Sequence, residues 1–431
     1  MFSSIARSPS ACLFILAAHL FLLAAPTVAH AAEFMEPRGE LTLNAAIGAA
    51  LQRNPALQHA AFEMRVADAR IAQAGLRPNP ELGMTLENFG GNGSVKGTDA
   101  LETTLSLSQV IELGGKRHHR LDVARYGRDT ATIEREAAQL DVLAEVTRRF
   151  IDVAESQEQL LLARRHSELA EKTLRAITAR VEAARSPLAE QNRASIALHR
   201  ARLDEKTALQ NLLSARRRLA ALWGSTEPNF GDAKTDWFDL PRVASFDDLV
   251  TRVKSNPDFL RFASESRQRD AEWQLAKAEA KSNVTVGAGI RRFEETGDNA
   301  FVVNFSMPLA FGNRNQAAIR EASIRREQLQ SNEQTALINA KTNLFAFYQS
   351  LELARSEIEQ LRGKIIPQAD IAVKQTHEGY ERGRFSYLEL ADAQRESIEL
   401  QRAAIAAAAS YHRTLAEIER LTNAPLVAPQ E

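Results

Sequence analysis

The periodicity of the sequence changes abruptly between residues 101 and 120, and it does so again about two hundred residues later. Up to Ile111, apolar residues alternate with polar ones, which is the pattern of a half-buried strand. After Gly114-Gly115 the pattern becomes helical for many turns, and glycine, which has no Cβ, permits the sharp change of direction. The same succession recurs from Phe301 to Asn315. The sequence therefore predicts a tandem duplication.

Each predicted repeat contains a broken helix, two strands and two long helices. The first repeat spans residues 32–224, with strands at about 81–88 and 100–111 and helices continuing to 224. The second spans residues 246–424, with strands at about 283–293 and 300–310 and helices continuing to about 422. Asn54-Pro55 and Asn256-Pro257 break the opening helices, because proline is not tolerated in a helix interior. Residues 225–245 form an irregular linker, and residues 425–431 form a C-terminal tail.

The first 31 residues have the features of a secretory signal peptide. Arg7 supplies the positive region, Ala11 to Ala25 the short apolar region, and Ala29-His30-Ala31 the small-x-small cleavage pattern. Cleavage would remove Cys12, the one cysteine of the chain, and would exclude disulfides, thiolate metal sites and cysteine catalysis. We expect an exported protein.

Composition and motifs argue against several function classes. The 54 Lys and Arg balance 55 Asp and Glu, so nothing favours nucleic-acid binding through bulk charge. No nucleophile-base arrangement or phosphate loop indicates an enzyme, and no cofactor is expected. His118-His119 invites a metal-site interpretation, but adjacent helical residues point about 100° apart and share an ion poorly.

The strands leave two architectures open. A strand of about ten residues is long enough to cross a bilayer at a tilt. Four strands cannot close a barrel, since small membrane barrels need about eight, so membrane strands would require several copies to share one barrel. The alternative is a soluble four-stranded sheet against helices. The long helical stretches favour the membrane interpretation, because helices this long must pack on each other as coiled coil or as the wall of a tube.

Several motifs resemble one known family. They are Asn54-Pro55, Pro78-Asn79-Pro80 before a strand, and above all the run from Ser108 to Arg117, Ser-Gln-Val-Ile-Glu-Leu-Gly-Gly-Lys-Arg. With the duplication, these residues resemble the outer-membrane factors of bacterial tripartite efflux systems, the TolC family. The similarity is greatest to the heavy-metal branch of that family.

The resemblance implies a mainly α fold with a membrane β-barrel. A homotrimer would form a twelve-stranded barrel in the outer membrane of a Gram-negative bacterium, and a twelve-helix tunnel would extend from it into the periplasm. The chain would be a passive exit duct that works with a periplasmic adaptor and an inner-membrane RND pump. Its cargo would be divalent cobalt, zinc or cadmium. The alternatives are a duct for drugs or type I secretion, or a soluble periplasmic coiled-coil adaptor.

The resemblance also assigns candidate residues to the two helical turns. In the second turn, Gly383-Arg384-Phe385-Ser386 matches the Gly-x-x-Ser pattern of the family, and Glu389 and Asp392 fall on the acidic positions of the periplasmic aperture. In the first turn, Ala184 replaces the usual glycine, Arg185-Ser186-Pro187 forms the tip, and Glu190 is the acidic counterpart. Both tips are expected to contact the adaptor. The alternative for the acidic residues is an ordinary solvated helix face.

The remaining candidates lie at the junction between barrel and tunnel. Gly114, Gly115 and Lys116 form this junction in the first repeat, and Gly312 and Arg314 form it in the second. Lys116 and Arg117 would lie at the level of the inner headgroups, where cationic side chains meet anionic lipid.

Overall fold

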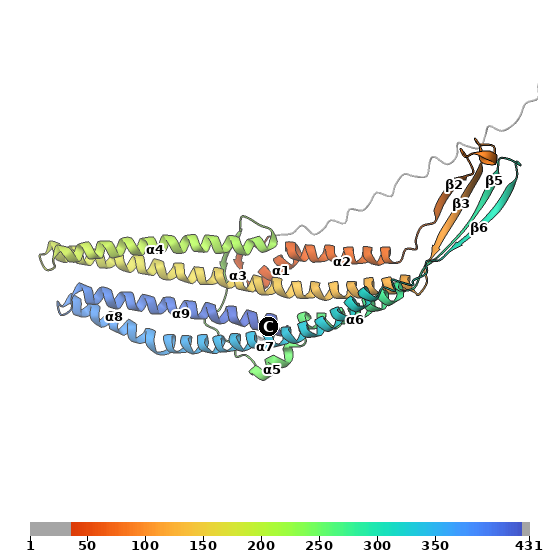
Figure 1. The fold of residues 1–431 in the computed structure, drawn as a ribbon. Helices are drawn as coiled ribbons and strands as arrows, with labels where there is room; N and C mark the ends of the chain where they lie inside the picture. Colours follow the sequence, from red (N-terminus) through yellow and green to blue (C-terminus); the bar gives the residue numbers. More distant parts are fainter. Residues whose placement is uncertain (1–35, 425–431) are drawn as a thin grey trace, which may run out of the picture. The chain divides into compact units, whose positions relative to one another are not determined.

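The computed structural model describes residues 36–424, so the predicted signal peptide and the predicted tail lie outside the described residues. The chain divides at Glu36, and every element below belongs to the unit that starts at Pro37. This unit is mainly helical, with one four-stranded and one two-stranded sheet (Figure 1).

The first half of the unit contains four α-helices and four strands. In chain order these are β1 (Gly39–Leu41), α1 (Leu43–Arg53), α2 (Pro55–Ala74), β2 (Glu81–Glu87), β3 (Glu102–Ile111), α3 (Lys116–Glu182), α4 (Leu188–Ala220) and β4 (Phe230–Ala233), with short 3-10 turns at Gly93–Val95 and Ala221–Trp223. Helix α3 has 67 residues, which corresponds to a length of about 100 Å.

The second half repeats this succession with small changes. It contains α5 (Phe246–Val253), α6 (Pro257–Glu279), β5 (Val284–Phe293), β6 (Asn299–Ser306), α7 (Gln316–Gln360), α8 (Ile366–Glu381) and α9 (Tyr387–Thr422). A π-helical turn, Leu361–Ile365, joins α7 to α8, and Pro367 is the second residue of α8. Because proline lacks an N–H, it disrupts a regular α-helical ladder, and a π-turn is a common adjustment to such a break.

Two details differ from the sequence-based expectations. Strand β6 ends at Ser306 rather than near residue 310, and Pro308, which has no N–H for a ladder hydrogen bond, follows closely. The segment 225–245 is not irregular throughout, because β4 pairs in parallel with β1, with Gly39 opposite Phe230. The side-chain amide of Gln157 forms two hydrogen bonds with the backbone of Ala233. It accepts from the N–H at 2.7 Å and donates to the C=O at 3.2 Å.

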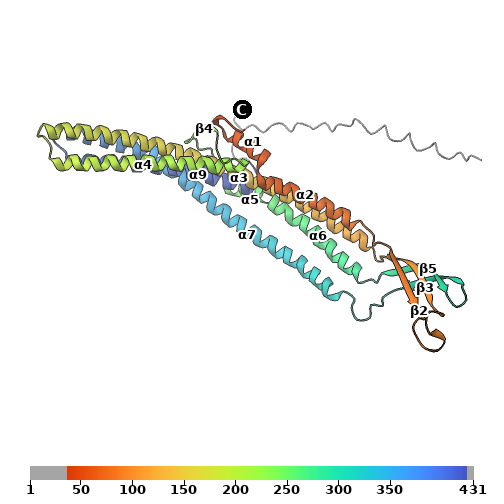
Figure 2. The ribbon, with the colours of Figure 1, turned by 90° about the horizontal axis from the view of Figure 1, so that it is seen from above.

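The four-stranded sheet and two successive layers of helices form three levels along the unit. In each level, two elements from the first half of the chain lie next to two elements from the second half. The four-stranded sheet runs β2-β3-β5-β6, with every pair antiparallel. Next to it, helices contact in the order α2-α3-α6-α7, and farther from it in the order α4-α3-α9-α8 (Figures 1 and 2). Each level therefore has one edge from the first half of the chain (β2, α2, α4) and one from the second half (β6, α7, α8).

The two Asn-Pro motifs perform the same task in the two halves. The side-chain oxygens of Asn54 and Asn256 each accept a backbone N–H of the helix that follows, at 2.9 Å. Their amide groups donate to the ends of the returning helices, to Leu222 O at 2.9 Å and to Arg420 O at 2.6 Å. Both asparagines are buried, so each satisfies helix-terminal groups that water cannot reach.

Candidate functional site

One face of the four-stranded sheet is apolar and exposed. Directly opposed residues share a face of a sheet, so the register places thirteen apolar side chains together. Phe301 is 91% exposed, Val303 77% and Leu82 74%. The other members are Met84, Leu86, Leu105, Leu107, Ile111, Val284, Val286, Ala288, Ile290 and Phe305. This face has the composition of a surface that contacts lipid or another protein.

The opposite face of the sheet is mostly polar or small. It includes Thr85, Ser106 and Asn304, and three charged side chains near the ends of the strands that lie away from the helices. There the guanidinium of Arg291 bonds to Glu102 at 2.7 Å and to Glu87 at 3.0 Å. The sheet thus separates an apolar from a polar surface over its full width.

At the strand-to-helix junction of the first half, the two glycines adopt a conformation that other residues rarely adopt, as the sequence predicts. Gly114 and Gly115 have φ of 79° and 75°, which is the left-handed region. A Cβ on Gly114 would lie 2.7 Å from the Lys281 side chain, so this position also requires close approach. The second junction differs, because Asn315 (φ 58°) rather than Gly312 takes the left-handed conformation there. Arg314 donates from Nε to Ala310 O at 3.3 Å.

The structure corrects the expected role of Lys116. This residue was expected to face lipid headgroups, but it is only 8% exposed and its Nζ donates to Asn283 Oδ1 at 2.6 Å. Arg117 is exposed and donates from Nε to Gly75 O at 2.6 Å. Burial of a lysine ammonium requires hydrogen-bond partners, so Lys116 joins two junction segments instead of contacting lipid.

The two helical turns have the same backbone geometry. Arg185 N donates to Arg180 O at 2.8 Å, and Arg384 N donates to Gly379 O at 2.8 Å. Ala184 (φ 55°) and Gly383 (φ 72°) occupy the same left-handed position. Ala184 therefore replaces glycine in conformation as well as in sequence, at the cost of strain.

The acidic residues of the second turn are engaged locally. Ser386 and Glu389 form a capping box, in which the Glu389 carboxylate accepts the Ser386 N–H at 2.7 Å. These hydrogen bonds, from the Ser386 backbone and then its hydroxyl, lower the pKa of Glu389. Asp392 forms an exposed ion pair with Arg395 one turn later. The capping motif is visible in the sequence as Ser-x-x-Glu, but this role of Glu389 was not predicted.

Glu190 instead connects the two turns. The Tyr380 hydroxyl donates to Glu190 Oε2 at 3.2 Å, and the Arg180 guanidinium lies 4.8 Å from the Tyr380 ring centre. Burial, followed by electrostatic repulsion from Glu190, raises the pKa of Tyr380. Tyr380 belongs to a buried cluster from α3, α4, α8 and α9, whose other members are Ile177, Ala194, Tyr387 and Leu390. This cluster was not predicted from the sequence, in which the tyrosines on either side of the turn were the available signal.

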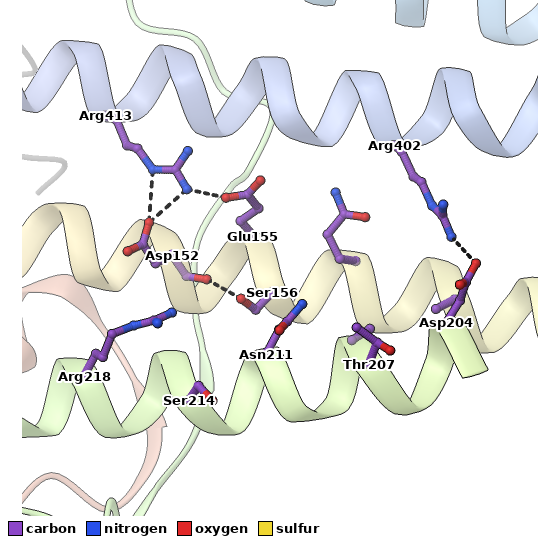
Figure 3. A pocket seen from close by; sticks show the side chains of 13 residues that line it. Asp152, Glu155, Ser156, Asp204, Thr207, Asn211, Ser214, Arg218, Arg402 and Arg413 are labelled. Carbon is purple, nitrogen blue, oxygen red and sulfur yellow. Dashed lines mark hydrogen bonds and ion pairs between the residues drawn. The ribbon is translucent and has the colours of Figure 1, made fainter. Parts of the chain in front are cut away.

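A polar groove of about 670 Å³ lies between α3, α4 and α9, away from the turns (Figure 3). Arg413 binds Asp152 at 2.9 Å and also binds Glu155, while Arg402 binds Asp204 at 3.0 Å. All three carboxylates lining this groove thus pair with arginines of α9. These pairs join helices of the first half to α9 of the second.

Comparison of the chain with models of known protein families identifies its family. The model described as outer membrane efflux protein matches residues 46–225 and 252–424, which together make up most of the chain. The chain belongs to the outer membrane efflux protein family. The predicted family resemblance is thereby confirmed.

Relatives of this outer membrane efflux protein include proteins of metal resistance. The cobalt-zinc-cadmium resistance protein CzcC of Cupriavidus metallidurans is 30% identical over 364 residues, which cover 84% of each chain. The nickel and cobalt resistance protein CnrC of the same organism is 27% identical over 281 residues, covering 64% of this chain and 66% of the relative. A membrane protein of known structure from Pseudomonas aeruginosa has a TM-score of 0.74 at 20% identity, covering 88% of this chain and 90% of that one. The helix-rich fold with a few strands is therefore shared with that structure.

Among residues 36–424, no helix is both long and apolar enough to cross a membrane. Within the same range, no three His, Cys, Asp or Glu side chains are grouped to hold a metal ion. His118, considered above as a ligand, is exposed and lies 3.3 Å from Asp122.

Proposed function

We propose that the protein is the outer-membrane exit duct of a tripartite efflux system and acts as a homotrimer. Three copies would join their four-stranded sheets into one twelve-stranded barrel and their helices into a twelve-helix tunnel. The chain would conduct without catalysis or a cofactor. An inner-membrane RND pump would supply the driving force through a periplasmic adaptor.

The observation that carries this proposal is the shared order of elements at three levels. Each level is an open layer that ends in the first half of the chain on one side and in the second half on the other. Open strand edges are not tolerated in lipid, so a sheet with this apolar face needs neighbours at β2 and β6. Copies related by rotation would supply them, β6 of one copy meeting β2 of the next.

The helical edges support the same arrangement. Helix α4 exposes Leu188, Ile196 and Leu203, and α7 exposes Ile338, Phe345 and Leu353, each between 52% and 69% exposed. The members of each set are seven or eight residues apart, which is the spacing of a coiled-coil seam. Rotation would bring α4 of one copy against α8 of the next, and α7 against α2, and these contacts would bury both sets.

The contact between the two turns is the proposed gate at the periplasmic end. Glu190 and Tyr380 hold the two halves of one copy together there. The tips Arg185-Ser186-Pro187 and Gly383-Arg384-Phe385-Ser386 would receive the adaptor. Separation of the turns would break the Glu190–Tyr380 contact and widen the aperture, around which Asp392 and Glu389 would add negative charge.

Heavy-metal cations are the proposed cargo, with cobalt, zinc and cadmium first. The support is the relationship to CzcC and CnrC, whose names specify resistance to these metals or to nickel. Drugs and secreted polypeptides are the competing cargoes, since duct residues carry little information about what passes through.

Two experiments test the proposal. Membrane fractionation should place the protein in the outer membrane as a heat-modifiable trimer, and a soluble monomer would contradict the duct itself. Deletion of the gene should raise sensitivity to zinc, cobalt or cadmium, with complementation by the intact gene as the control. Drug sensitivity with normal metal tolerance would contradict the cargo only.

A further inference from the structure

Two glutamates oppose each other directly on the polar face of the sheet. Glu87 at the end of β2 pairs in register with Glu102 at the start of β3. Like charges placed directly opposite each other destabilise a pair of strands. The position is also suited to a cation, because converging carboxylate oxygens are the ligands that hard divalent cations prefer.

A guanidinium from the next strand occupies this position. Arg291 of β5 donates Nη1 to Glu102 at 2.7 Å, Nη2 to Glu87 at 3.0 Å and Nε to Thr104 Oγ1 at 2.9 Å. The second oxygen of Glu102 accepts from Asn88 at 2.8 Å. One side chain thus connects three strands and neutralises part of the charge of both carboxylates.

We propose that Arg291 is a tethered counter-ion that prevents divalent cations from binding at the far end of the sheet, and that it thereby determines the selectivity of the duct. The inference rests on the proposed function: in a barrel whose apolar face meets lipid, the polar face would line the lumen, and the strand ends that lie away from the helices would form the exit. A conduit must bind its cargo weakly enough to release it. Two uncompensated carboxylates in each copy would retain the exported metal at the last step.

The chemistry of arginine suits this task. Its guanidinium stays protonated at any pH the cell reaches, and its planar fork matches two carboxylates at once. The neutralisation therefore needs no diffusible ion. It is also intramolecular, so it is present in every copy irrespective of the metal concentration.

The test uses the full-length protein in planar lipid bilayers, with zinc chloride added to a potassium chloride solution. Arg291→Gln should lower the zinc concentration for half-maximal block by about tenfold, which corresponds to about 1.4 kcal/mol. The double variant R291Q/E102Q, which removes one carboxylate as well, should return the block toward that of the wild type.

Two single variants serve as controls. Arg291→Lys keeps the positive charge but loses the planar fork, so its zinc block should lie between that of the wild type and that of Arg291→Gln. Arg292→Gln removes a positive charge from the neighbouring residue, which lies on the other face and pairs with Glu294 at 3.1 Å, and it should leave zinc block unchanged. If R292Q changed the block as much as R291Q, general charge would explain the result and the proposal would be overturned.

A complementary variant keeps the proposal testable if R291Q does not assemble. In E87Q/E102Q the guanidinium is unopposed, so the reversal potential in a salt gradient should shift toward anion selectivity. An unchanged reversal potential, or an R291Q channel with normal zinc block, would overturn the role of Arg291. A wild-type protein that inserts without conducting would instead contradict the proposed duct.

Discussion

The two halves of the chain are alike at Asn54 and Asn256 but differ at the helical turns. Both asparagines cap one helix and hold the end of another. At the turns, Glu190 and Glu389 occupy the same third position of α4 and α9, yet Glu389 caps its own helix and Glu190 binds Tyr380 of the other half.

The residue before each helix explains this divergence. Ser386 has a hydroxyl and a free N–H, so it forms a reciprocal capping box with Glu389. Pro187 has neither group, and α4 begins without a side-chain cap. The Glu190 carboxylate is therefore available for a contact between the two halves. A local difference of one capping residue thus decides which turn connects to the other.

The largest expected effect tests the similarity of the two halves. Replacement of Asn256 by alanine removes a helix cap and leaves buried carbonyl groups of α9 without a donor, so we expect a loss of about 3 kcal/mol of unfolding free energy. Asn54→Ala should cost somewhat less, since its amide reaches one carbonyl rather than two. Thermal unfolding followed by circular dichroism would measure both, and a neutral Asn256→Ala would contradict the account.

The next prediction tests the contact that only one turn makes. Tyr380→Phe removes a hydrogen bond to a charged carboxylate and should destabilise the turns by about 1.5 kcal/mol. The matched control is Tyr387→Phe, in the same buried cluster, which should have a smaller effect. In planar bilayers, Tyr380→Phe should also raise the open probability. Equal effects of the two variants would show that the Glu190 contact contributes nothing specific.

Two opposite substitutions test the left-handed position of the two turns, and we expect smaller effects from them. Ala184→Gly should stabilise the protein by about 1 kcal/mol, because glycine adopts the left-handed conformation without strain. Gly383→Ala should destabilise it by a similar amount. The shift in thermal midpoint should have opposite signs for the two variants, and shifts of equal sign would contradict the equivalence of the turns.

The smallest expected effect concerns pH. The folded-state pKa of Glu389 lies below its ordinary value of 4.5, so the capping box stabilises the protein above that pH and loses this contribution as the pH falls through the lowered pKa. Ser386→Ala should therefore reduce the loss of stability on acidification. Thermal melts between about pH 3 and 6 would show this, with Glu190→Gln as the comparison at the other turn.

Much of the fold could be predicted from the sequence because its signals are local. Alternation located the four strands of the larger sheet, and the Asn-Pro motifs and turns located the helix breaks. Strand β4 was missed because it has four residues and its partner, β1, lies far away in sequence. The burial of Lys116 and the contact of Tyr380 were missed for the same reason. Lys116 bonds to Asn283, and Tyr380 bonds to Glu190 of the other half. Contacts between distant segments leave no periodic pattern.

The pairing of β1 with β4 has a consequence for the order in which the chain acquires structure. These strands bracket the first half, so its beginning and its end meet before any residue of the second half is needed. In the exported chain expected from the sequence, which emerges with its N-terminus first, the first half can form its internal hydrogen bonds, including that of Asn54 to Leu222, before α5 to α9 have emerged. The second half then has a finished α3 to fold against. The first half thus provides the surface against which the second half packs.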